Sequence, residues 1–140
     1  MNRGAMGTAI MSPGELVIGL SHIGIRVRDY TRARAFYELL GFKHAWGPVG
    51  PEQVAAMRHD SGLEINLIVN AVDSAPNILM DVPEKHAGFT HFALKIEDVA
   101  AAEAALAAAG IEITGRRGTN PVNAIFVRDP DRNVIELAAD

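Results

Sequence analysis

Two histidines recur at a fixed spacing in this chain, and histidine is the commonest metal ligand among protein side chains. Three pairs of landmark residues lie 69 positions apart (22 to 91, 29 to 98 and 41 to 110): His22 and His91, Asp29 and Asp98, and Gly41 and Gly110. Further along, the offset grows by one, and three consecutive pairs match: Ile65 and Ile135, Asn66 and Glu136, and Leu67 and Leu137. This spacing indicates an internal repeat, which is best identified before any local feature is interpreted.

The repeat places polar side chains on matching strand faces, because side chains alternate along a strand. Four such faces follow from the sequence: His22 with Gly24 and Arg26, His91 with Ala93 and Lys95, Glu64 with Asn66, and Val134 with Glu136. If the two repeats pack with pseudo-twofold symmetry, we expect His22, His91 and Glu136 to converge on one cavity. Imidazole with carboxylate suits a divalent Fe, Mn, Ni, Co or Zn ion. The chain has no cysteine, so no thiolate can contribute.

Each candidate residue also has a plainer interpretation. A single histidine in an apolar strand is usually a hydrogen-bonded polar residue at a sheet end. Glu136 would be costly to bury alone, and either a metal ion or Arg26 would supply a partner. Arg26 could bind an anionic substrate group bidentately or form an ion pair at a strand end, and the case for Lys95 is weaker. The metal-free alternative is a barrel in which these residues only make hydrogen bonds. Residues 129–131 (Asp-Pro-Asp) are interpreted as a turn.

The elements that would position these residues read strand, helix and three strands, twice. Strands are predicted over residues 16–27, 42–46, 53–59, 63–69, 89–96, 111–114, 122–127 and 134–138. Helices are predicted over residues 30–40 and 99–109, each after an aspartate N-cap and before a glycine. The fold class is therefore α+β, with two tandem βαβββ modules. Residues 1–14 are predicted to be a flexible leader and 15–140 a single domain, with module one at about 15–70, a linker at 71–87 and module two at about 88–140.

Composition narrows the class of function. The chain has 140 residues and a net charge of −4 with histidine neutral, which does not support a basic groove for nucleic acid. No apolar run reaches the ~18 residues that span a bilayer. The leader lacks the charged and apolar regions of a signal peptide, so we expect a cytoplasmic protein with a small-molecule partner.

Three segments together resemble the vicinal oxygen chelate superfamily, which includes glyoxalase I, bleomycin-resistance proteins and extradiol dioxygenases. They are SHIGIRVRDYTRARAFYELLGF, THFALKIEDVAAAEAALAAAGI and FVRDPDRNVIEL, and the likeness covers about residues 16–138. The resemblance implies paired βαβββ modules in a half-open, mostly antiparallel barrel. It also implies a homodimer with a divalent metal in the concave face.

The resemblance implies a ligand set of His22, His91 and Glu136, with Glu136 also the catalytic base. Arg26 resembles the glyoxalase arginine that meets the glutathione carboxylate. One position departs from the family pattern, because the register with Glu136 places Asn66, not an acid, where the first-module glutamate would stand. Asn66 is then a substrate-binding candidate. Glu64, two residues earlier, could replace that glutamate only if the strand is bulged or shifted.

Three functions remain open from the sequence. The first is a glyoxalase-like, metal-dependent lyase or isomerase that acts on a small, anionic, oxygen-chelating substrate. The second is an Fe(II) dioxygenase, since two histidines and one carboxylate resemble a facial triad. Extradiol dioxygenases place further His and Tyr residues near the metal, whereas this chain has tyrosine only at positions 30 and 37. The third is a metal-free protein that binds or sequesters a small molecule.

Overall fold

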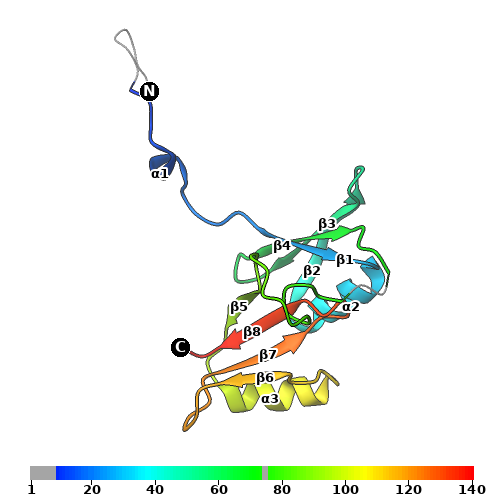
Figure 1. Ribbon diagram of the computed structural model, residues 1–140, viewed down its shortest axis with the longest axis vertical. Coiled ribbons are helices and arrows are strands. Elements are labelled where there is room, and N and C mark those ends of the chain that lie inside the picture. The colour runs from blue at the N-terminus through cyan, green and yellow to red at the C-terminus, as the bar shows by residue number, and fades with distance from the viewer. Residues whose placement is uncertain (1–8, 74–75) are drawn as a thin grey trace.

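The computed structural model describes residues 9–73 and 76–140, and its elements follow the predicted repeat (Figure 1). After a short helix α1 (Pro13–Leu16), module one contains β1 (Ile23–Val27), α2 (Tyr30–Leu39), β2 (Phe42–Val49), β3 (Val54–His59) and β4 (Glu64–Val69). Module two contains β5 (His91–Lys95), α3 (Val99–Ala108), β6 (Gly115–Arg117), β7 (Ala124–Arg128) and β8 (Val134–Ala138). The order βαβββ therefore occurs twice.

Each module forms one open, mixed sheet of four strands. The strand orders are β1-β4-β3-β2 and β5-β8-β7-β6. The first strand of each module runs parallel to the last, and the other pairs are antiparallel. Gly24 pairs with Asn66, and Ala93 pairs with Glu136. The predicted α+β fold of two βαβββ modules is thus confirmed, and neither described sheet closes into a barrel.

The two long helices begin and end at the residues that the repeat singled out. The Asp29 side chain accepts a hydrogen bond from the Thr31 backbone N–H at 3.0 Å. Asp98 accepts one from the Ala101 N–H at 3.1 Å. Such caps satisfy amide groups that have no partner within the helix. Gly110 follows α3 with φ +75°, a conformation that glycine adopts without steric cost.

Three of the predicted strands have boundaries that differ by three residues or more from those of the structure. Strand β1 begins at Ile23, opposite Ile65, rather than at residue 16. Strand β2 continues to Val49 through register shifts. In module two, residues 111–114 do not form a strand, because the residues paired with β7 begin at Gly115, opposite Phe126. The strand lies instead at Gly115–Arg117, where it pairs with β7 in a segment that lies between two predicted strands.

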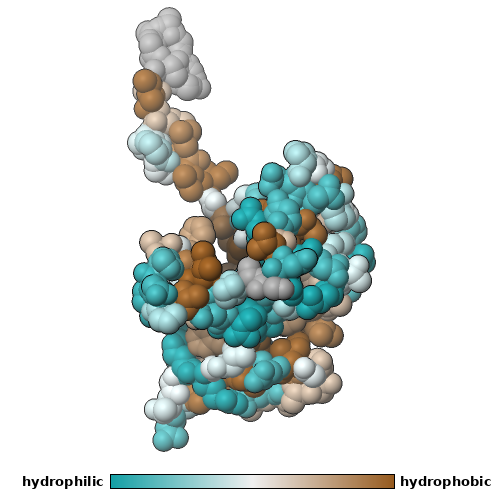
Figure 2. Space-filling view, turned by 45° about the vertical axis from the view of Figure 1, so that its right-hand side comes forward, coloured by the Kyte–Doolittle hydropathy of each residue, from teal (hydrophilic) through white to brown (hydrophobic). Residues whose placement is uncertain are grey.

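The predicted leader lies only partly within the described residues. Residues 1–8 fall outside them, and Pro13–Leu16 forms the short helix α1. Ser12 and Glu15 form a capping box. The segment stands away from the two modules in Figure 1, and Figure 2 shows apolar side chains along it. Within residues 9–73 and 76–140, no helix is long and apolar enough to cross a membrane.

One hydrophobic core joins the two modules. Sheet residues in this core are Ile25, Val27, Ile65 and Leu67 from module one, and Ile125, Val127, Ile135 and Leu137 from module two. Asn66 lies between Ile65 and Leu67, and Glu136 lies between Ile135 and Leu137. Because side chains alternate, Asn66 and Glu136 extend from the face of their sheet that is opposite the core.

A buried polar contact also connects the modules. Tyr37 on α2 is fully buried and donates a hydrogen bond to Oδ2 of Asp129 at 2.8 Å. Asp129, only 3% exposed, also accepts from Asn133 and from the Asp131 backbone N–H. Burial raises the pKa of the Asp129 carboxyl, and the hydrogen bonds from Asn133 and Tyr37 oppose that rise. The predicted turn at residues 129–131 is therefore confirmed and is also an inter-module contact.

Tyr37→Phe should lower the free energy of unfolding by about 1–3 kcal/mol, because it removes a hydrogen bond to a buried carboxylate. Urea denaturation measures this change. Tyr30→Phe is a matched control on the same helix, since Tyr30 is only partly buried and contacts His44. We expect the control to change stability by less than about 0.5 kcal/mol. Equal losses in both variants would contradict the assigned contact.

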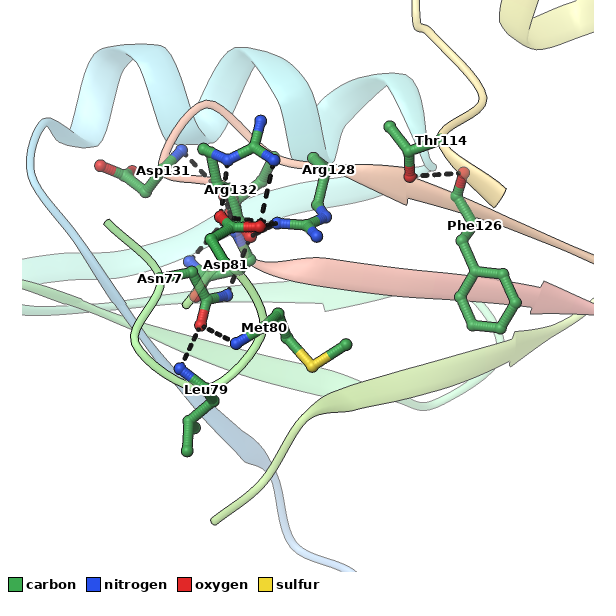
Figure 3. Close-up of polar contacts among 11 residues, drawn as sticks. Asn77, Leu79, Met80, Asp81, Thr114, Phe126, Arg128, Asp131 and Arg132 are labelled. Atoms are coloured by element: carbon green, nitrogen blue, oxygen red, sulfur yellow. Dashed lines mark hydrogen bonds and ion pairs between the residues drawn. The ribbon is translucent and has the colours of Figure 1, made fainter. Parts of the chain in front are cut away.

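Ion pairs attach the linker to module two. In Figure 3, the Asp81 carboxylate lies between the guanidinium groups of Arg128 and Arg132. The nitrogen–oxygen distances are 3.0 Å and 2.7 Å. The Asn77 side chain donates to the Arg132 carbonyl at 3.0 Å. The hydrogen bond from Arg132 lowers the pKa of Asp81. These contacts hold Leu79 of the linker in place, where it lines the cavity described next.

Candidate functional site

The two histidines occupy equivalent places at the starts of β1 and β5. His22 directly precedes β1, and His91 is the first residue of β5. Each follows a hydroxyl residue: Ser21 Oγ lies 2.9 Å from His22 Nδ1, and Thr90 Oγ1 lies 2.8 Å from His91 Nδ1. With Nδ1 engaged, Nε2 of each imidazole is directed to the neighbouring strand of its own sheet.

In module two, that neighbouring strand supplies Glu136. His91 Nε2 lies 3.1 Å from Glu136 Oε1. Arg117 donates to the other oxygen, Oε2, from Nε at 3.1 Å and from Nη2 at 2.8 Å. Glu136 is only 6% exposed, and a buried carboxylate needs such a partner. The hydrogen bond to Glu136, followed by that to Asp140, raises the pKa of Arg117. Arg117 therefore holds one carboxylate oxygen and leaves the other facing His91.

In module one, the equivalent neighbour of the histidine is Asn66. In the amide orientation that satisfies both of its polar atoms, Asn66 accepts from His22 Nε2 at 3.1 Å and donates to Glu64 Oε2 at 3.0 Å. Glu64 binds Arg58 Nε through its other oxygen at 2.9 Å. The β1–β4 register contains no bulge that would bring Glu64 into the position of Asn66. Asn66, not Glu64, is therefore the residue beside His22.

The two half-sites, His22 with Asn66 and His91 with Glu136, do not merge within one chain. His22 and His91 line the same cavity of about 390 Å³, whose lining does not include Glu136. Within the described residues, no three His, Cys, Asp or Glu side chains are placed together to hold an ion. Glu136 contacts His91 from the face of its sheet that is opposite the core. The convergence of His22, His91 and Glu136 on one cavity stays a prediction.

Arg26 lies in the same cavity as the histidines. Its Nε donates to Asn70 Oδ1 at 2.8 Å, and Asn70 in turn donates to Glu52. Among the described residues, Arg26 forms no ion pair of its own, so its charge can attract an anion. Lys95 lies elsewhere, in a cleft beside the β3–β4 turn. The similarity of Lys95 to Arg26 is thus one of repeat position only.

The donor groups present fit a divalent ion in part. His91 Nε2 and Glu136 Oε1 are adjacent and have the chemistry of two first-row metal ligands. His22 Nε2 is a third donor of the same kind in the other half-site. Sequence reasoning missed Arg117, because the predicted strands did not include residue 117. It also missed Ser21 and Thr90, although these two hydroxyl residues share the repeat offset (21 to 90).

Comparison with known proteins identifies the family. The model of the Glyoxalase/Bleomycin resistance protein/Dioxygenase superfamily matches residues 19–137. A glyoxalase family protein from Enterococcus faecalis is 26% identical, with a TM-score of 0.70 over 86% of this chain and 96% of that chain. The fosfomycin resistance protein FosX from Listeria monocytogenes, solved with Mn(II) and sulfate, is 21% identical, with a TM-score of 0.64 over 89% of this chain and 91% of that chain. No curated protein matches the chain. The chain belongs to the Glyoxalase/Bleomycin resistance protein/Dioxygenase superfamily, as its resemblance to vicinal oxygen chelate proteins implied.

Proposed function

We propose that this chain is a metal-dependent lyase or isomerase of the superfamily, acting on a small anionic substrate that chelates through oxygen. Its ligands are His22, His91 and Glu136. The observation that carries the proposal is the contact between His91 Nε2 and Glu136 Oε1 at 3.1 Å, with Arg117 on the other carboxylate oxygen. The Mn(II) complex of FosX supports a divalent ion in this fold.

We further propose that two copies of the chain form a homodimer in which His22 of one copy joins His91 and Glu136 of the other. Each half-site lies on the face of its sheet away from the core of its own chain, so a second chain can cover that face. A twofold dimer would then contain two identical sites, because the same surfaces meet twice.

The side chains have distinct tasks in this proposal. His22, His91 and Glu136 would hold a divalent ion that would supply Lewis-acid stabilisation of an enolate-like transition state. Glu136 is both a ligand and the candidate base, and Arg117 orients its carboxylate. Arg26 binds an anionic group of the substrate bidentately. Asn66 offers a neutral amide in place of a fourth ligand, so it hydrogen-bonds the substrate rather than the ion.

The three-ligand set also suits an Fe(II) dioxygenase, which is the second candidate. The tyrosines give it no support. Tyr37 is buried against Asp129, and Tyr30 contacts His44. Neither lines the cavity that contains the histidines. We therefore favour the lyase or isomerase.

Protein purified without chelator should retain about one divalent ion per chain, measured by elemental analysis. His22→Ala should lose the ion and, with it, binding of oxygen-chelating probes. The absence of stoichiometric metal in the wild type, together with intact ligand binding in His22→Ala, would favour the metal-free binding function. Oxygen consumption with catechols would instead identify the dioxygenase. His86→Ala, an exposed histidine outside the repeat, is the matched control.

A further inference from the structure

The hydroxyl groups that precede the two histidines form a second, smaller repeat. Ser21 and Thr90 are separated by the same offset as His22 and His91 (21 to 90 and 22 to 91). Each hydroxyl oxygen is within 2.9 Å of Nδ1 of the following histidine. On the other side of each ring, Nε2 lies 3.1 Å from an acceptor oxygen, of Asn66 in one module and of Glu136 in the other.

The arrangement constrains the position of the ring proton. A neutral imidazole carries one N–H and has one bare nitrogen. In the structure described, Nε2 faces an oxygen acceptor and must therefore carry the proton. Nδ1 is then bare, and the hydroxyl group donates to it. An ion held through Nε2, the nitrogen that faces Glu136 in His91, would require the opposite arrangement. It would take the lone pair of Nε2, and Nδ1 would then carry the proton and donate it to an acceptor.

A hydroxyl group can serve both arrangements because it is a donor and an acceptor and can rotate. A carboxylate or a backbone carbonyl at the same place could only accept, and would fix the ring in the metal-binding tautomer. We infer that Ser21 and Thr90 are positioning residues that let His22 and His91 change tautomer when an ion binds. The inference rests on the proposed function. The change is neutral overall, because Nε2 releases a proton to water and Nδ1 takes one up.

A second serine–histidine contact in the chain, between Ser61 and His59, does not allow a change of tautomer. Ser61 Oγ also lies 2.9 Å from a histidine nitrogen, Nδ1 of His59. Here, however, the backbone N–H of Ser61 donates to the same nitrogen at 3.0 Å. A backbone amide can only donate, so Nδ1 of His59 stays bare whatever the hydroxyl does. Ser61→Ala is therefore a matched control, a serine lost beside a histidine that cannot switch.

Nitrogen-15 NMR of the full chain tests the tautomers directly, with Zn²⁺ as a diamagnetic probe. In metal-free protein we expect His22, His91 and His59 to carry the proton on Nε2. With Zn²⁺, the proton should move to Nδ1 in His22 and His91 and remain on Nε2 in His59. Metal-free rings with the proton already on Nδ1 would overturn the inference. Zn²⁺ bound with the proton still on Nε2 would overturn it as well.

Zinc affinity provides the second test. Ser21→Ala and Thr90→Val should each weaken Zn²⁺ binding by about 10- to 100-fold, the range for residues that support metal ligands. The conservative changes Ser21→Thr and Thr90→Ser should restore it, and Ser61→Ala should leave it unchanged. Equal affinity in Ser21→Ala, Thr90→Val and the wild type would overturn the inference but keep the proposed metal site. A wild type that binds no zinc would overturn both.

Discussion

Glu136→Gln should weaken Mn(II) binding by at least about 100-fold. Mutation of a residue that only supports a ligand lowers metal affinity by about 10- to 100-fold. Glu136 is itself the single charged ligand of the proposed set, so a larger loss is expected. Glutamine has nearly the same shape, so the packing between Ile135 and Leu137 is retained. The amide cannot neutralise Arg117, and its oxygen is a much weaker donor to a cation. Calorimetric titration of the full chain with Mn(II) measures the effect.

Glu64→Gln is the matched control, because Glu64 is the carboxylate nearest to the equivalent position of module one. It contacts Asn66 and Arg58 rather than His22. We expect its Mn(II) affinity to stay within about threefold of the wild type, since the exposed pair with Arg58 contributes little. A loss as large as that of Glu136→Gln would mean that Glu64 is a ligand and would contradict the three-ligand assignment.

Mixed dimers should separate a shared site from a site within one chain. A dimer of one His22→Ala chain and one Glu136→Gln chain has both defects in one shared site and none in the other. It should bind about one ion, against about two in the wild-type dimer and none in either parent variant. Differently tagged chains allow the mixed dimer to be purified, and elemental analysis counts the ions.

A site formed within one chain predicts a different result for the mixed dimer. If His22, His91 and Glu136 of the same chain formed each site, every site of the mixed dimer would contain one defect. Such a dimer would bind no ion at high affinity. The Tyr37→Phe chain, whose change lies in the core, provides a paired control in which both sites should remain intact. A chain that stays monomeric while it binds metal would also exclude the shared site.

The repeat could be predicted from the sequence because it involves positions, the helix N-caps and helix ends, that few residue types can occupy. An N-cap needs a short polar side chain, and a helix end favours glycine, so Asp29 and Gly41 mark one helix as Asp98 and Gly110 mark the other. The sequence also contains a signal for helix α1. Ser12 and Glu15 form a capping box, and Pro13 occupies the first helical position between them. The capping box lies across the end of the segment predicted to be a leader, residues 1–14.

Strand β6 and the packing of the modules could not be predicted in the same way. Residues 111–114 alternate as a strand would, but Ile111 and Ile113 bury their side chains without pairing. Periodicity reports which side chains are buried and not which backbone groups are paired. Arg117 was missed for this reason. The alternation of side chains places Glu136 on one face of its sheet. It does not determine which module packs against that face, because this depends on tertiary packing.

The absence of an acidic partner for Arg26 among the described residues has a consequence for how ligands approach. Arg117 offsets the charge of Glu136, and Arg58 offsets that of Glu64. The charge of the Arg26 guanidinium, in contrast, is not offset by a described carboxylate. Arg26 therefore creates a local region of positive potential on a chain whose net charge is −4. The field of the whole molecule repels large polyanions, while a recess of opposite sign attracts a small anion once it comes within about a Debye length. The protein would then discriminate between small and large anions during diffusional association, before the ligand is bound. Added salt would weaken this discrimination because it screens both charges.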